Sequence, residues 1–236
     1  MARLKGIETG IDGLDVLLGG SIPLKSQMLV VGAPGTGKTI MAFEVLLNCA
    51  RRGIPCAFIA LDEKPDNLIR NAGGTLDNSD AIKKLISEKL LAVEGSETAA
   101  KIATNTESET SYTIGNLISD MEGIIKSVDA EIVVIDSLSF LKLMLGKTLL
   151  YNKSVSSVVS NLRRLGVASI TTLEVPYYQR DRMKFGQELL MYDGVITMYK
   201  SENGDLLEMK IAKMRGSNHS RAAVQYSITS EGIKFK

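Results

Sequence analysis

Apolar residues along the chain form short continuous runs that alternate with longer stretches of helical spacing. The runs at 28–32, 55–61, 131–136 and 168–173 predict buried strands, and 90–93 predicts a shorter one. Apolar residues recur every three or four positions at 38–52, 113–127 and 149–165, and Pro65 suits the first turn of a helix through Ala72. This alternation predicts an α/β fold, with a mainly parallel central sheet and helices on both faces.

The pattern changes after Gly194. Residues 195–200, 206–214 and 222–228 are typical of strands, and the turn at 202–205 separates the first two. We therefore expect C-terminal antiparallel hairpins that extend one edge of the sheet. The polar stretch 94–111 is expected to be a surface excursion.

Composition narrows the class of protein. A chain of 236 residues with 44 % hydrophobic residues is long enough for one ordinary core, so we expect a single domain over 1–236. The formal net charge of +1 lacks the cationic excess of a protein held to nucleic acid by bulk charge. No signal-peptide pattern or membrane-spanning run is present, so we expect a cytoplasmic protein without membrane insertion. Cys49 and Cys56 are expected to be buried thiols.

The stretch GAPGTGKT carries the strongest chemical signal. It fits G-x-x-x-x-G-K-[ST], follows a predicted strand and opens a predicted helix. Loop amides and the helix dipole in this pattern hold phosphate oxygens, a lysine reaches the β and γ phosphates, and a hydroxyl binds Mg²⁺. The pattern predicts a bound nucleotide with Mg²⁺. The expected binding residues are Gly32, Ala33, Pro34, Gly35, Thr36, Gly37, Lys38, Thr39 and Ile40, with Thr39 also a metal ligand.

Two further acidic positions end predicted strands. Asp136 closes an apolar strand and is expected beside the phosphate loop as the second Mg²⁺ group, although alone it also fits a helix N-cap. Asp62 and Glu63 follow another strand and are candidates to orient and deprotonate water. They equally fit a structural role, in which their negative charges stabilise the helix that begins at Pro65 by interacting with the positive end of its dipole.

The segment KMRGSNH places two cations on one face of a strand. Lys213 and Arg215 lie two residues apart and therefore project together, as solvated surface cations also do. His219 is the only histidine, and read alone it fits a surface residue.

Several of these stretches together resemble the KaiC-type branch of the RecA/RadA/DnaB ATPases, in a single-domain, archaeal-type form. The resemblance rests on GIETGIDGLDVLLGGSIP, the phosphate loop, LDE, IDSL, TTLE, YDGV and KMRGSNH, which cover essentially the whole chain in order. It implies a RecA-like fold and a ring, usually a hexamer, with ATP between subunits. It further implies that Lys213 and Arg215 act on the neighbour's γ-phosphate, and that His219 lies close to the same interface as a nucleotide-binding residue. Asp62 and Glu63 would fill the places of the paired catalytic acids.

The departures from the family pattern bear on activity. Asp62 stands where the family usually has a glutamate, and its shorter side chain is expected to slow turnover. Leu189 and Leu190 occupy the positions of the phospho-acceptor pair of the clock protein, so we expect no autophosphorylation of that kind.

Three functions remain open at this stage: an ATP-hydrolysing ring, a nucleotide-dependent switch or scaffold with little hydrolysis, and a RadA-paralogue-like protein that binds single-stranded DNA. The DNA interpretation rests on loops expected at 139–153 and 177–184, where lysines, arginines and tyrosines are interleaved.

Overall fold

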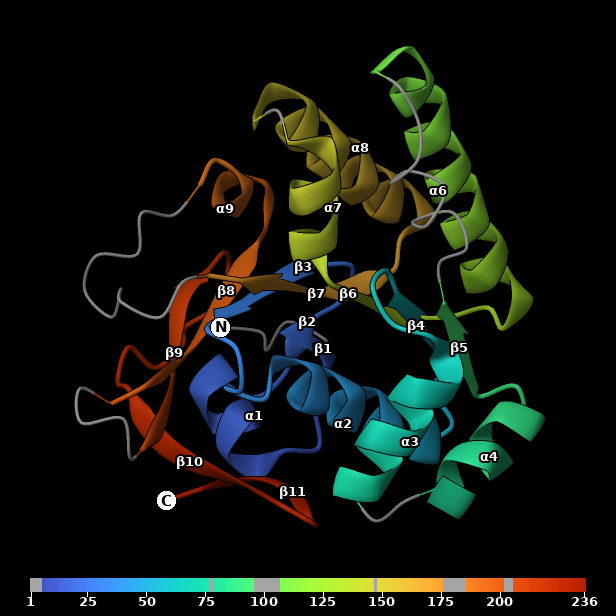
Figure 1. The fold of residues 1–236 in the computed structure, drawn as a ribbon. Helices are drawn as coiled ribbons and strands as arrows, with labels where there is room; N and C mark the ends of the chain where they lie inside the picture. The colour runs from blue at the N-terminus through green and yellow to red at the C-terminus, as the bar shows by residue number, and fades with distance from the viewer. Residues whose placement is uncertain (1–5, 77–78, 96–106, 147, 176–185, 202–205) are drawn as a thin grey trace.

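In the described part of the chain, a mixed sheet of nine strands separates two layers of helices (Figure 1). The computed structural model describes all residues except 1–5, 77–78, 96–106, 147, 176–185 and 202–205. The strand order is β11-β10-β9-β8-β3-β7-β6-β4-β5. The six strands from β8 to β5 are parallel to one another, whereas β9, β10 and β11 are antiparallel additions beyond β8.

The described elements have the following bounds. The strands are β1 (Gly6–Ile7), β2 (Ile22–Pro23), β3 (Gln27–Gly32), β4 (Cys56–Ala60), β5 (Leu91–Gly95), β6 (Ile132–Asp136), β7 (Ala168–Glu174), β8 (Gly194–Lys200), β9 (Leu207–Met214), β10 (Val224–Thr229) and β11 (Gly232–Phe235), with β1 and β2 paired apart from the main sheet. The helices are α1 (Asp12–Leu18), α2 (Lys38–Arg51), α3 (Pro65–Thr75), α4 (Ser79–Ser87), α6 (Glu107–Ser127), α7 (Leu138–Leu145), α8 (Thr148–Leu165) and α9 (Glu188–Met191).

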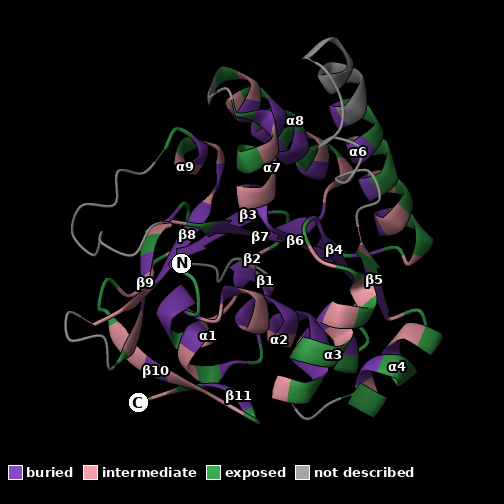
Figure 2. Cartoon of the chain, viewed as in Figure 1, coloured by how far each residue is buried: buried purple, intermediate pink, exposed green. Residues whose placement is uncertain are grey.

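Both faces of the central strands are buried, which explains their continuous apolar runs (Figure 2). Side chains alternate between faces, so Met28 and Val30 of β3 pack with α1–α4, while Leu29 and Val31 pack with α6–α9. Figure 1 shows these two helix layers on opposite sides of the sheet. The same alternation places Asp136 of β6 on the α2 side, because Val134 belongs to that core.

The α/β architecture and the antiparallel C-terminal strands confirm the sequence prediction. The expectation of a loop at 139–153 was wrong, because α7 and the first turns of α8 occupy most of that segment. Leu138, Leu141 and Leu145 are buried at helical spacing, and this packing fixes α7 as a helix. The other expected loop, 177–184, lies outside the described residues. Among the helices that the structure describes, none has the length and apolar character required to cross a bilayer.

Candidate active site

The phosphate loop joins β3 to α2 at the carboxyl end of the parallel strands. Gly35 and Gly37 have φ values of +73° and +86°, a backbone conformation that favours glycine. Gly37 is also the N-cap residue of α2 and makes no side-chain capping hydrogen bond. The first amides of α2 therefore have no side-chain cap from that residue, and a helix N-terminus of this kind suits an anion.

Lys38 lies across this loop rather than in solvent. Only 9 % of the residue is exposed, and its Nζ donates to the Ala33 carbonyl at 3.0 Å. Burial lowers the pKa of Lys38, and the nearby charges of Glu174 and Asp136 partly oppose that shift. An arriving phosphate would replace the Ala33 carbonyl as the partner of this ammonium.

At the end of β6, the carboxylate of Asp136 accepts hydrogen bonds from two hydroxyl groups. Thr39 Oγ1 donates to Asp136 Oδ2 at 2.7 Å, and Thr172 Oγ1 donates to Oδ1. Thr172 reaches this carboxylate because β7 lies between β3, which leads into the phosphate loop, and β6. The sequence assigned no separate role to Thr172, because β7 also buries the hydroxyls of Ser169 and Thr171 and nothing in the pattern distinguishes the three.

The oxygen atoms of Thr39 and Asp136 fit Mg²⁺, which prefers oxygen ligands and usually retains waters and substrate phosphates. Thr39 and Asp136 would hold the ion, and it would neutralise phosphate charge when bound. Within the described part of the chain, no group of three or more His, Cys, Asp or Glu residues is arranged to hold a metal unaided.

The two candidate acids point in different directions. Asp62 Oδ2 accepts a hydrogen bond from Ser137 Oγ at 3.2 Å, next to Asp136. Although Asp62 is exposed as a residue, partial desolvation of its carboxyl and the charge of Asp136 raise its pKa. Glu63 Oε1 instead accepts from Asn71 Nδ2 of α3 at 2.8 Å. Of the two acids, Asp62 lies beside the expected metal group and Glu63 is turned toward α3.

Lys213 and Arg215 lie toward the other end of the sheet. In the strand register, Lys213 is opposite Val195 of β8, and the Arg215 amide donates to the Asp193 carbonyl at 2.9 Å, level with Gln27 at the start of β3. At about 3.3 Å per residue, the five steps from Gln27 to Gly32 span roughly 17 Å. The cations are therefore separated from the phosphate loop of their own chain.

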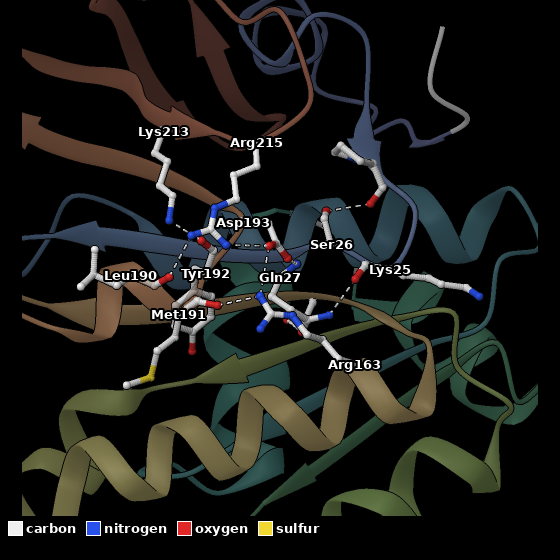
Figure 3. Close-up of polar contacts among 12 residues, drawn as sticks. Lys25, Ser26, Gln27, Arg163, Leu190, Met191, Tyr192, Asp193, Lys213 and Arg215 are labelled. Carbon is white, nitrogen blue, oxygen red and sulfur yellow. Dashed lines mark hydrogen bonds and ion pairs between the residues drawn. The ribbon is translucent and has the colours of Figure 1, made fainter. Parts of the chain in front are cut away.

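The carbonyls of four consecutive residues at the end of α9 each accept a hydrogen bond from a cation. Figure 3 shows those of Leu190, Met191 and Tyr192. Lys213 Nζ donates to the carbonyls of Leu189, at 3.0 Å, and Tyr192, at 2.5 Å. The Leu190 carbonyl accepts from Arg215 at 3.3 Å, and the Met191 carbonyl accepts from Arg163 at 2.7 Å. The final carbonyls of a helix lack helical donors, so this segment suits cations.

The carboxylate of Asp193 joins these cations to the sheet. Its Oδ1 lies 3.0 Å from Arg163 and 3.6 Å from Arg215, and its Oδ2 accepts from the Gln27 amide at 2.9 Å. Burial lowers the pKa of Lys213, and the charge of Arg215 lowers it further. The sequence did not reveal the role of Arg163, because α8 brings it to Asp193 only through tertiary packing.

His219 belongs to the segment that follows β9 and packs on the end of α1. Its neighbour Ser220 donates its amide to the Leu17 carbonyl at 2.9 Å, and Ser217 Oγ donates to the Leu18 carbonyl at 3.4 Å. His219 therefore lies on the segment that continues from Lys213 and Arg215. These two hydrogen bonds attach that segment to α1 and not to the phosphate loop.

Comparisons with known proteins agree over nearly the whole chain. A family model described as the KaiC ATPase matches residues 7–236. A UPF0273 protein of Aeropyrum pernix is 34 % identical, covering 96 % of this chain and 92 % of the relative. A circadian clock oscillator protein KaiC of Rippkaea orientalis is 26 % identical over 98 % of this chain, which spans 44 % of that longer protein. The crystal structure of a KaiC-like protein from Pyrococcus horikoshii OT3 shares the fold, with a TM-score of 0.83, 24 % identity, and coverage of 99 % of this chain and 100 % of the other.

Proposed function

Because the chain belongs to the KaiC family of ATPases, we propose that it binds ATP with Mg²⁺ at residues 32–40 and hydrolyses it within a ring of identical subunits. Each copy would hold the triphosphate on its own loop. Lys213 and Arg215 would serve the nucleotide held by the adjacent copy, with His219 near that interface. The family's usual hexamer is the ring size we propose.

One observation carries this proposal: the phosphate loop and the cation pair lie toward opposite ends of the parallel strands. At about 3.3 Å per residue, Arg215 starts roughly 17 Å and Lys213 roughly 10 Å along the strands from Gly32, and both side chains are held at the end of α9 instead. A neighbouring copy is the simplest source of a phosphate for them. A hollow of about 390 Å³ beside Lys213, lined also by Leu189, Leu190 and Val195, leaves room at this end for a group from another molecule.

Different residues would supply the separate parts of the reaction. Lys38 would exchange the Ala33 carbonyl for a phosphate oxygen, and Thr39 with Asp136 would hold the metal. Asp62, with its raised pKa and its place beside Asp136, is the candidate to orient and accept a proton from the attacking water. Arg215 would stabilise the charge that develops on the transferred phosphoryl group, as arginine fingers do in other NTPases.

A slow, nucleotide-dependent switch is the second candidate. The two candidate catalytic acids favour this function, because Asp62 has a short side chain and Glu63 is hydrogen-bonded to Asn71. In that case ATP would bind and promote assembly, while turnover would stay low. The measured rate of phosphate release separates this function from that of an active hydrolase.

A mixing experiment tests the action between subunits. Lys38→Ala should lose ADP binding and hydrolysis, while Arg215→Ala should keep binding and lose hydrolysis. When equal amounts are mixed under subunit exchange, about a quarter of the sites should combine an intact loop with an intact cation pair, and that fraction of activity should return. Arg164→Ala is the control, because this exposed arginine pairs with Glu122 away from the site. Full activity of Arg215→Ala alone would refute the proposed role.

A further inference from the structure

The C-terminal hairpin of β10 and β11 packs directly on the phosphate loop. Tyr226 of β10 donates its hydroxyl to the Thr36 carbonyl at 2.6 Å, and this bond is buried. On β11, the Ile233 amide donates to Glu44 of α2 at 2.8 Å. Each strand of the hairpin therefore contributes one hydrogen bond to the loop or to the helix that follows it.

The hydrogen bond from Tyr226 to the Thr36 carbonyl affects the direction in which the Gly37 N–H points. The Thr36 carbonyl and the Gly37 N–H belong to the same planar peptide unit, in which a trans bond points them in opposite directions. Gly37 lies at φ +86°, and glycine tolerates several backbone conformations, so this peptide unit needs an external constraint to keep one orientation. A hydrogen bond on the carbonyl side supplies that constraint and directs the N–H away from the hairpin.

The hairpin also approaches position 37 closely, so a side chain there would have to displace a side chain of β10. A Cβ placed on Gly37 would lie 2.6 Å from Ile228 Cδ1 of β10. Thr36 itself is fully buried, and its own hydroxyl donates to the Ala33 carbonyl at 2.9 Å. The hairpin thus covers the outer side of the loop, opposite the side on which the Gly37 N–H projects.

We propose that Tyr226 is a positioning residue of the nucleotide site, because its hydroxyl fixes the Thr36–Gly37 peptide with the Gly37 amide directed at the phosphates. The inference rests on the proposed binding of ATP at this loop. It extends the site to β10, which stands three places from β3 in the sheet order. Because coupling between two sites is reciprocal, a bound nucleotide in turn stabilises the hairpin.

Tyr226→Phe removes only the hydroxyl, and Tyr151→Phe is the matched control. Tyr151 is 3 % exposed, lies on the opposite face of the sheet, and its hydroxyl has no hydrogen-bond partner among the described residues. We expect Tyr226→Phe to raise the dissociation constant for ADP about tenfold, as the loss of one buried hydrogen bond allows. Tyr151→Phe should leave it unchanged. Urea unfolding without nucleotide measures the stability of each variant separately.

The outcomes distinguish the possible failures. If Tyr226→Phe lowers stability but binds ADP like the wild type, the tyrosine is merely structural and the inference is wrong. If the wild type binds no ADP, or if Lys38→Ala binds equally well, the proposed function itself fails. If Tyr226→Phe does not fold, hydrogen exchange of the wild type decides. ADP should slow exchange in residues 224–235, and unchanged exchange there would overturn the inference.

Discussion

Replacing Thr172 with valine tests how Asp136 is held for the proposed Mg²⁺. Thr172 is fully buried and donates to one oxygen of Asp136, while Thr39 donates to the other. Valine keeps the shape of the side chain and removes the donor. The carboxylate, in a residue only 8 % exposed, would lose one of these two hydrogen bonds.

The expected size of the effect follows from the charge on the acceptor. A hydrogen bond to a charged group contributes about 1.5–3 kcal/mol, and its loss leaves Asp136 less firmly oriented. At about 1.4 kcal/mol per factor of ten, this corresponds to a roughly tenfold to hundredfold weakening of Mg²⁺-dependent nucleotide binding. The free energy of unfolding without nucleotide should fall by a similar energy, because the acceptor is buried.

Thr171→Val is the matched control for Thr172→Val. Thr171 is equally buried, but it lies on the other face of β7, and its hydroxyl makes no hydrogen bond of good geometry with the described residues. It should leave Mg²⁺ dependence unchanged and stability unchanged or slightly higher. Fluorescent-nucleotide titrations at a series of Mg²⁺ concentrations give the first quantity, and urea unfolding gives the second. Equal Mg²⁺ dependence in both variants would refute the role of Thr172, and Thr172→Ser should restore most of the loss.

Two further predictions concern buried titratable groups. Burial lowers the pKa of Lys38 below 10.5, so just under that pH the unfolded chain binds more protons than the folded chain. The free energy of unfolding of the wild type, relative to Lys38→Met, should therefore rise with pH in this range while ADP affinity falls; a parallel change of both would contradict this. Cys49 and Cys56 are fully buried, and both thiols should react with DTNB only as the protein unfolds. Rapid labelling of either thiol in the native protein would contradict their placement.

Much of the fold follows from local patterns in the chain. The apolar runs of β3, β4, β6 and β7 are buried on both faces, and such strands are recognisable without knowledge of their neighbours. The helix at 138–145 was harder to recognise, because its sequence is apolar almost throughout and its spacing shows little contrast. Lysines nearby suggested a binding loop, yet Lys142 lies 5.8 Å from the ring centre of Tyr151 and belongs to that helix.

The residues of the candidate site were likewise only partly predictable from the sequence. The phosphate loop and Asp136 were identifiable because their residues are consecutive or end an apolar strand. Tyr226 was not, since it lies 190 positions from Thr36 and meets it only when the hairpin folds over the loop. Asp193 and Arg163 likewise pair across 30 positions. Spacing along a chain carries little information about contacts that depend on how distant elements pack.

The separation of the phosphate loop from Lys213 and Arg215 has a geometric consequence for assembly. A protein with an acceptor at one end and a donor at the other has polarity, so copies that use both ends associate head to tail. Such an arrangement either closes on itself or grows as a filament, and an open chain always leaves one pocket incomplete. A closed circle leaves none. Activity per molecule should therefore rise with protein concentration until closure is complete.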